Sequence, residues 1–413
     1  MTLKDKAFKW LDGSADGIVE LESLLSSIPA IAPESGGQGE MRKAETLVGW
    51  LGSKGIHEIE RFDAPDTRVP GGKRPNIVAT IAGTAPDDGE AGRVWIMSHL
   101  DVVPEGDKSM WRTDPFKVLR KDGRVYGRGV EDNQQGLVGS VFAVLAILAS
   151  GGQPVSTVKL LFVADEEVGS AHGIQHLLKA NGLFRRSDVI VIPDGGNARG
   201  DEIEVAEKNL CWLKVITKGK QCHGSTPDEG ANAFLAACEL ALRINALEKT
   251  AFPARDPLFQ PDRSTLSPTR KEANVPNINT IPGDDVFYVD MRILPCYSID
   301  SVLAEISKTM REVESGRGVK ISYEIVQRNE SKATDSDAPA VKKLAKAIKE
   351  IYGVDAKAVG IGGGTVGAYL RNAGFDCVVW AKLEETAHQP NENALIENII
   401  GDAKVFASLM LEV

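Results

Sequence analysis

One segment decides the fold of this chain: Val158-Lys159-Leu160-Leu161-Phe162-Val163-Ala164-Asp165-Glu166-Glu167-Val168-Gly169-Ser170. Its apolar half predicts a buried strand, which delivers two adjacent carboxylates, Glu166 and Glu167, to a turn rich in small residues. Neighbouring side chains of a strand point to opposite faces, but at the bend after a strand they can serve different partners. A solvated strand end is the commoner explanation of an isolated Glu-Glu pair. The choice therefore depends on the other segments.

Composition and charge narrow the class of protein. The length of 413 residues predicts roughly two to three domains. A hydrophobic content of 42%, a charged content of 26% and 41 glycines are ordinary for a globular enzyme. The formal net charge of -10 argues against nucleic acid or an anionic membrane as the main partner.

The cysteines and the first residues indicate the compartment. The five cysteines are an odd number, widely scattered and without a C-x-x-C pair, so neither a disulfide framework nor a thiolate zinc site is predicted. Residues 1–10 interleave charged with apolar residues and do not resemble a secretory signal, and no stretch approaches the length of a membrane span. We therefore expect a cytoplasmic protein with reduced cysteines.

Other strand-like segments also end beside acids or histidines. Residues 94–97 lead to His99 and Asp101, the arrangement from which a metal ligand and its orienting carboxylate arise. A lone histidine is nevertheless more often a packed or capping residue. Residues 188–192 lead in the same way to Asp194.

A glycine-flanked loop adds another acid, Asp132, just before a helix expected over residues 134–150. Taken alone, Asp132 is better explained as the N-cap of that helix. Ligands collect at strand ends in open α/β sheets, however. The repetition of acids and histidines at successive strand ends therefore favours one common site.

From about residue 209 the pattern changes to that of a second domain. Strands over 211–217, 286–293 and 319–326, helices over 231–247 and 298–313, and a further strand near 277–281 make a β-α-β-β-α-β set. After it, helices over 339–351 and 393–411 and strands over 356–361 and 375–380 return to an α/β pattern. We expect a domain inserted at 209–328 between the two parts, 1–208 and 329–413, of an α/β domain.

A second loop histidine, His388, lies between the last predicted strand and helix. Two histidines with several carboxylates and no thiolate suit Zn²⁺ or a similar divalent ion, and a carboxylate shared by two ions makes a two-metal site. Such a pair polarises a carbonyl and acidifies a water molecule, while a carboxylate that is not a ligand takes the proton. Amide hydrolysis is the natural reaction, with one glutamate of the doublet as ligand and the other as base.

Five motifs follow one another along the chain. They are Ser98-His99-Leu100-Asp101-Val102-Val103-Pro104, Gly127-Arg128-Gly129 with Asp132, Asp165-Glu166-Glu167-Val168-Gly169-Ser170, Asp194, and Thr386-Ala387-His388-Gln389-Pro390-Asn391-Glu392. These motifs resemble those of the M20 family of dinuclear zinc peptidases and amidohydrolases. The family includes carboxypeptidases, dipeptidases, deacetylases and desuccinylases, and the resemblance spans nearly the whole chain. It implies a catalytic domain with a mixed sheet flanked by helices and an inserted ferredoxin-like lid or dimerisation domain.

The resemblance also implies two Zn²⁺ per subunit, with Co²⁺ or Mn²⁺ as alternatives, and a cis peptide after Asp132. Glu166 matches the general base, and Asp101 matches the carboxylate that orients His99. The implied ligands are His99, Asp132 and Asp194 for one ion and Asp132, Glu167 and His388 for the other.

In the inserted domain, the segment Cys222-His223-Gly224-Ser225-Thr226-Pro227 resembles the motif whose histidine reaches a partner subunit's site to stabilise the oxyanion. This implies a homodimer joined through the inserted domain, although a plain hinge turn is the alternative. Family segments that bind substrate match here at Asn279, Arg292, Gly363, Gly364 and Thr365, with Arg292 suited to a carboxylate.

Two departures from the family pattern bear on the substrate. Asp at position 194 resembles the residue that dipeptidases and aminopeptidases of the family have at this place. Glu at this place is more typical of carboxypeptidases and acyl-amino-acid hydrolases. Thr365 is followed by Val366-Gly367 where many relatives have Asp-Ala, so recognition of a substrate carboxylate stays open.

The leading hypothesis is hydrolysis of a dipeptide or small peptide. The alternatives are an N-acyl-amino-acid amidohydrolase and a non-catalytic peptide-binding relative.

Overall fold

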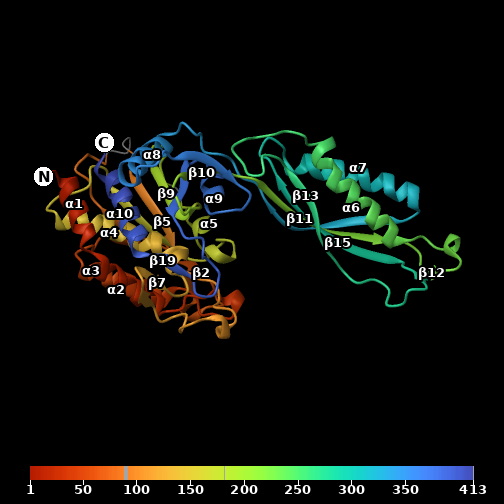
Figure 1. The fold of residues 1–413 in the computed structure, drawn as a ribbon, viewed down its shortest axis with the longest axis horizontal. Helices are drawn as coiled ribbons and strands as arrows, with labels where there is room; N and C mark the ends of the chain where they lie inside the picture. The colour runs from red at the N-terminus through yellow and green to blue at the C-terminus, as the bar shows by residue number, and fades with distance from the viewer. Residues whose placement is uncertain (88–91, 181, 413) are drawn as a thin grey trace. The chain divides into compact units, whose positions relative to one another are not determined.

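A computed structural model describes residues 1–87, 92–180 and 182–412. The chain forms two compact units (Figure 1). Unit 1 comprises Met1–Val205, Thr334–Ala358 and Thr365–Val413, and unit 2 comprises Ala206–Ala333 and Val359–Gly364. The breaks expected after residues 208 and 328 lie near the unit edges at 205 and 333.

The main sheet has eight strands in the order β1-β4-β8-β5-β9-β18-β10-β17. Strands β8, β5, β9 and β18 run parallel to one another, and β4 and β10 run antiparallel to their neighbours, so the sheet is mixed as predicted. The carboxyl ends of the parallel strands meet at one edge. The strands are β1 (Ile59–Arg61), β4 (Ile77–Ile81), β5 (Val94–His99), β8 (Val158–Val163), β9 (Val189–Asn197), β10 (Glu202–Glu207), β17 (Lys357–Ile361) and β18 (Cys377–Lys382).

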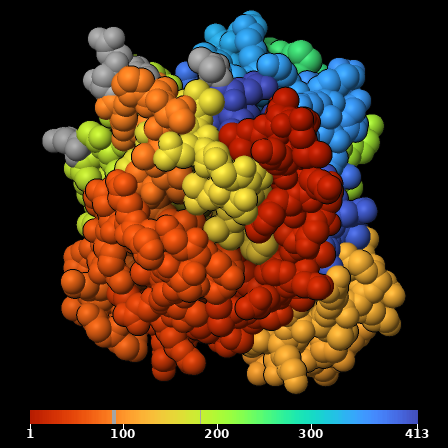
Figure 2. Space-filling view, turned by 90° about the vertical axis from the view of Figure 1, so that its left-hand side faces the viewer, coloured from red at the N-terminus to blue at the C-terminus, as the bar shows by residue number. Residues whose placement is uncertain are grey.

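Helices cover both faces of this sheet. Helix α4 packs on β5 and β9 and is itself enclosed by α1, α2 and α10, which explains why it is apolar on all sides. On the other face, α5 and α9 share a core with Trp95, Ile190 and Val379. In Figure 2, the N-terminal segments in red and orange surround the yellow end of α4. The helices are α1 (Leu3–Asp12), α2 (Ala15–Ser26), α3 (Met41–Ser53), α4 (Gln135–Ala149), α5 (Ile174–Leu177), α8 (Pro339–Tyr352), α9 (Gly367–Asn372) and α10 (Ile396–Leu411).

After the glutamate doublet, the chain forms the single helical turn of α5. A Cβ on Gly173 would lie 2.1 Å from the carbonyl oxygen of Ala164, so this glycine allows the chain to turn back against the end of β8. Its backbone is not helical, with φ -94° and ψ -122°. The chain therefore turns back at Gly173, and the helical turn α5 begins only after this residue.

A buried carboxylate ties the starts of two central strands together. Asp188, just before β9, accepts hydrogen bonds from the backbone and guanidinium of Arg93 and from the indole of Trp95. Removing one partner of a buried ion pair typically costs about 3–5 kcal/mol because the other charge is left unpaired. These hydrogen bonds hold β5 against β9. β5 ends at His99, and β9 contains Asp194.

Unit 2 has the predicted β-α-β-β-α-β order, with a four-stranded antiparallel sheet in the order β13-β15-β11-β16. Helices α6 and α7 pack on one face of the sheet, and buried residues of β15 such as Val289 and Met291 alternate with partly exposed ones such as Asp290. The elements are β11 (Asn209–Lys218), α6 (Ala233–Thr250), β13 (Thr265–Lys271), β15 (Asp284–Ile293), α7 (Ile299–Arg317) and β16 (Lys320–Asn329).

The fourth strand of this sheet was predicted in the wrong place. The fourth strand is β13, while β14 (Thr280–Ile281) pairs instead with β12 (Cys222–His223). β13 was not predicted as a strand because it contains Pro268. Proline lacks an N–H and is tolerated only on an edge strand, which is where β13 lies. The pairing with β15 shifts register just after this proline.

A small three-stranded sheet brings two loops of unit 1 together. Strands β6 (Leu119–Lys121) and β7 (Arg124–Tyr126) form a hairpin. They are joined by Asp122 and Gly123, both with positive φ, as this type of two-residue hairpin turn requires. On its other side, β7 pairs with β19 (Asn393–Leu395). The loop before β19 therefore lies beside the loop after β7. A two-stranded ribbon of β2 (Ala64–Pro65) and β3 (Lys73–Arg74) completes unit 1.

Within the described residues, none of the helices combines the length and apolar character needed to cross a membrane.

Candidate metal centre

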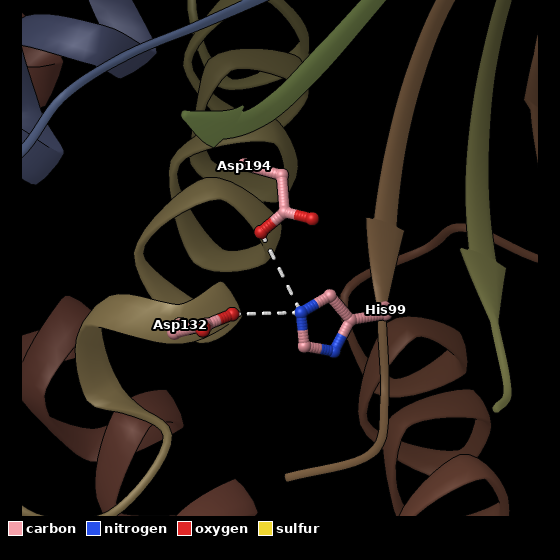
Figure 3. A group of neighbouring side chains, drawn as sticks. All are labelled: His99, Asp132 and Asp194. Atoms are coloured by element: carbon pink, nitrogen blue, oxygen red, sulfur yellow. Dashed lines mark hydrogen bonds and ion pairs between the residues drawn. The ribbon is translucent and has the colours of Figure 1, made fainter. Parts of the chain in front are cut away.

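The first of two side-chain clusters gathers at the edge where the parallel strands end (Figure 3). His99 is the last residue of β5, Asp194 lies in β9, and Asp132 lies in the turn before α4. The Nε2 atom of His99 is 2.8 Å from Oδ1 of Asp132 and 3.5 Å from Oδ1 of Asp194. Each of the three residues offers one potential ligand atom, and these three atoms lie within 4.8 Å of one another.

A second cluster shares Asp132 with the first. The Nε2 atom of His388 is 3.0 Å from Oδ2 of Asp132 and 3.1 Å from Oε2 of Glu167. Asp132 thus offers one oxygen to each histidine. The structure brings together all five residues expected to be ligands, in the two groups of three that the resemblance implied.

The turn that presents Asp132 is shaped by close packing. A Cβ on Gly129, whose φ is +86°, would lie 2.5 Å from Val102, so the position requires glycine. The Asp132-Asn133 peptide is cis, as the resemblance implied. The side chain of Asn133 accepts from the backbone N–H of His99 at 3.2 Å and donates to Oδ1 of Asp194 at 2.8 Å. Asn133 therefore joins the three strand-end segments, a role that nothing in the sequence pattern indicated.

Asp101 holds both the first histidine and the glutamate doublet. Its carboxylate accepts from the backbone N–H groups of Glu166 and Glu167 at 3.1 and 3.0 Å. The Nδ1 atom of His99 is 2.9 Å from the carbonyl oxygen of Asp101 and 3.6 Å from its carboxylate. The hydrogen bond that orients the ring therefore goes to the carbonyl, and it leaves Nε2 facing Asp132 and Asp194.

A buried arginine supports the doublet from behind. Glu166 and Glu167 begin a single 3₁₀ turn after Asp165, which has a left-handed backbone with φ +68°. The Nη1 atom of Arg74 lies 3.2 Å from Oδ1 of Asp165, and the rest of its guanidinium pairs with Glu40. Neither side chain of the Arg74–Glu40 pair is exposed. Arg74 was not identified from the sequence, since it lies far from the doublet along the chain.

The electrostatics of the clusters favour a bound cation. Burial raises the pKa of Asp194 to about 6, and hydrogen bonds to Asp132 and Glu167 raise the pKa of His388 to about 10. Burial, reinforced by the charge of Asp194, raises the pKa of Glu166 well above its ordinary value. Burial and the closeness of several carboxylates both favour a positive charge among these groups. Two imidazole nitrogens and several carboxylate oxygens, with no thiolate, form a donor set that fits Zn²⁺ or a similar divalent ion.

Most of the expected oxyanion and substrate residues belong to unit 2 and are described within it. His223 is exposed in β12, with Nδ1 2.8 Å from the hydroxyl of Ser225. Asn279, Gly363 and Gly364 are exposed loop residues, whereas Thr365 belongs to unit 1. The guanidinium of Arg292 is engaged within the unit.

Arg292 donates to Oδ1 of Asp290 at 2.8 Å and to the carbonyl oxygen of Gly362 at 2.6 Å. The same Asp290 carboxylate also accepts from the indole of Trp212 at 2.7 Å. A carboxylate that binds Arg292 would have to compete with these partners or use its remaining donors.

Comparisons with known proteins agree with the motifs. An uncharacterized metallohydrolase of Methanocaldococcus jannaschii is 40% identical over 410 residues, covering 95% of this chain and 98% of the relative. A succinyl-diaminopimelate desuccinylase of Wolinella succinogenes is 28% identical over 312 residues, covering 74% of this chain and 81% of the relative. The crystal structure of human carnosine dipeptidase 1 has the same fold, with a TM-score of 0.71 at 19% identity over 100% of this chain and 98% of that one.

The family model described as Peptidase family M20/M25/M40 matches residues 95–412, which is most of the chain. This match confirms the resemblance drawn from the five motifs. The chain belongs to peptidase family M20/M25/M40.

Proposed function

We propose that this M20-family metallohydrolase cleaves an amide bond in a dipeptide or small peptide and holds two zinc ions. The observation that carries the proposal is the position of Asp132, whose Oδ1 and Oδ2 lie 2.8 and 3.0 Å from two different histidines. The ligands would be His99, Asp132 and Asp194 for one ion and Asp132, Glu167 and His388 for the other. Bound ions would supply an acidified water and polarise the scissile carbonyl.

Glu166 is the proposed general base. It belongs to neither group of three, yet it is the immediate neighbour of Glu167 in the same turn. Asp101 fixes the backbone of this turn, so the Glu166 carboxylate is held beside the ligands without being one of them. In this position it can accept the proton of the attacking water and pass it to the leaving amine. Asp101 has a positioning role because it also orients His99.

His223 is the proposed oxyanion donor, acting in the site of a partner subunit. The support is the family-like motif around it and its exposed side chain in β12. The proposal requires a homodimer joined through unit 2. Asn279, Arg292, Gly363, Gly364 and Thr365 are the proposed substrate contacts. The cytoplasmic location stays a prediction.

Two observations divide the substrate classes. Asp194 favours a dipeptide or small peptide, because that residue at this position resembles dipeptidases and aminopeptidases. The identity to a succinyl-diaminopimelate desuccinylase favours the alternative, an N-acyl-amino-acid amidohydrolase using the same site.

A hydrolysis panel separates these classes. Metal-stripped protein should be inactive, and added zinc, manganese or cobalt should restore cleavage of dipeptides in preference to N-acetyl- and N-succinyl-amino acids. Product amines are measured with each metal. Preferential cleavage of the N-acyl compounds would establish the alternative, and no cleavage of any substrate would favour a non-catalytic relative.

The glutamate doublet provides a matched pair of variants. Glu166→Gln should keep two metals while kcat falls by about 10²–10⁴-fold, because only proton transfer is lost. Glu167→Gln, one residue away, should instead lose the second metal. Elemental analysis and steady-state kinetics on both proteins check this. Near-normal turnover or loss of metal in Glu166→Gln would contradict the assignment of the base.

Subunit mixing tests His223. His223→Ala should keep its metals and lose about 10²–10³-fold in kcat, as expected for a single oxyanion donor. Mixed with inactive Glu166→Gln, it should regain activity as subunits exchange, because one site of a mixed dimer has both groups. Absence of activity in verified heterodimers, or a fully active wild-type monomer, would show that His223 does not act in a partner's site.

A further inference from the structure

The turn that carries Asp132 is held by a glutamate from another loop. One side-chain oxygen of Glu392, Oε1, accepts hydrogen bonds from the backbone N–H groups of Gly129, Glu131 and Asp132 at 3.1, 3.0 and 3.1 Å. The other oxygen accepts from the guanidinium of Arg128. Glu392 is wholly buried and lies 260 residues from Asp132 along the chain.

The loop that carries His388 is held in the same way from the opposite side. Glu131, next to Asp132, has an exposed fraction of only 2%. Its carboxylate accepts from the backbone N–H groups of Glu384 and Thr386 and, at 2.8 Å, from the Thr386 hydroxyl. The two loops thus exchange glutamates, and we call Glu131 and Glu392 the crossed clamp.

The His388 loop has a backbone that needs such support. Glu385, His388 and Asn391 have φ values of 60°, 62° and 64°, in the left-handed region that residues other than glycine rarely adopt. Such conformations persist when surrounding contacts hold them. The pairing of β7 with β19 fixes only the far end of the loop. The bonds to Glu131 fix the part that leads into His388.

We propose that the crossed clamp sets the affinity of the two metal positions, and that each glutamate controls the ligand on the loop opposite its own. The inference rests on the proposed two-metal site. In the part of the chain that the structure describes, the hydrogen bonds accepted by the Glu131 carboxylate come from the His388 loop, so Glu131 should govern the second position alone. Glu392 contacts the turn of Asp132, which both positions share, so it should govern both.

The crossing distinguishes this role from a general effect on folding. Glu131 is the neighbour of the shared ligand Asp132, so a loss of local structure around it would weaken both positions. The hydrogen bonds predict loss at the second position only. Neither glutamate belongs to the two ligand groups, so both act as positioning residues.

Zinc binding to the metal-free protein tests the proposal. The wild type should bind two equivalents in competition with a chromogenic chelator. Glu131→Gln should weaken the second equivalent by about 10–100-fold, the usual effect of losing a group that positions a ligand, and leave the first unchanged. Glu392→Gln should weaken both equivalents. Glu385→Gln makes the same charge change at an exposed position of the same loop and should alter neither.

Amide hydrogen exchange on the same metal-free proteins measures how firmly the crossed clamp holds each loop when no metal is bound. Glu131→Gln should speed amide exchange in peptides covering residues 383–389, and Glu392→Gln should speed it in peptides covering 127–134. Should Glu131→Gln fail to fold, Thr386→Val removes one of its hydrogen bonds from the other side and should act in the same direction.

The outcomes separate the clamp from the two-metal site. If the wild type binds two equivalents and Glu131→Gln weakens both equally or neither, the clamp inference alone is overturned. If the wild type binds fewer than two, the proposed function fails and the inference fails with it. The crossed clamp is supported if each variant speeds hydrogen exchange in the loop opposite its own and Glu131→Gln weakens the second zinc equivalent alone.

Discussion

The structure of unit 1 depends on one electrostatic constraint, the convergence of several carboxylates and two imidazoles at the edge of the main sheet. Asp132, Glu167 and Asp194 supply oxygens within 4.8 Å of the ligand atoms of their groups, so negative charge is concentrated there. Like charges so close repel one another and destabilise the fold unless cations or hydrogen-bond donors offset them. The sheet brings the segments together, but its backbone ladders do not hold the side chains.

Hydrogen bonds from neighbouring segments hold them instead. Asn133 joins the ends of the strands, Asp101 fixes the glutamate doublet, and Arg74 supports the doublet through Asp165. Glu392 fixes the turn of Asp132 from a distant part of the chain. These supporting groups are buried or nearly so, which makes each hydrogen bond stronger and each unpaired partner costlier than it would be in water. The site is therefore pre-formed by the protein, and a divalent ion would offset the remaining charge.

The sequence predicted the parts of this site that follow from local pattern. Apolar runs marked β5, β8 and β9, and the acids and histidines after or within them were recognisable as a cluster. Supporting residues were missed because their partners are remote: Glu392 acts 260 residues away from Asp132, and Asn133 looks like an ordinary residue at the start of a helix. In unit 2, β13 was missed because edge position, which local pattern does not reveal, is what permits Pro268.

The proposed two-metal site requires Asp132 to bridge the two ions. Crystals of the zinc-loaded protein, measured on both sides of the zinc absorption edge, test it most directly. We expect two anomalous peaks, one among His99, Asp132 and Asp194 and the other among Asp132, Glu167 and His388, with one Asp132 oxygen on each. A single peak, or two peaks of which only one contacts Asp132, would contradict it.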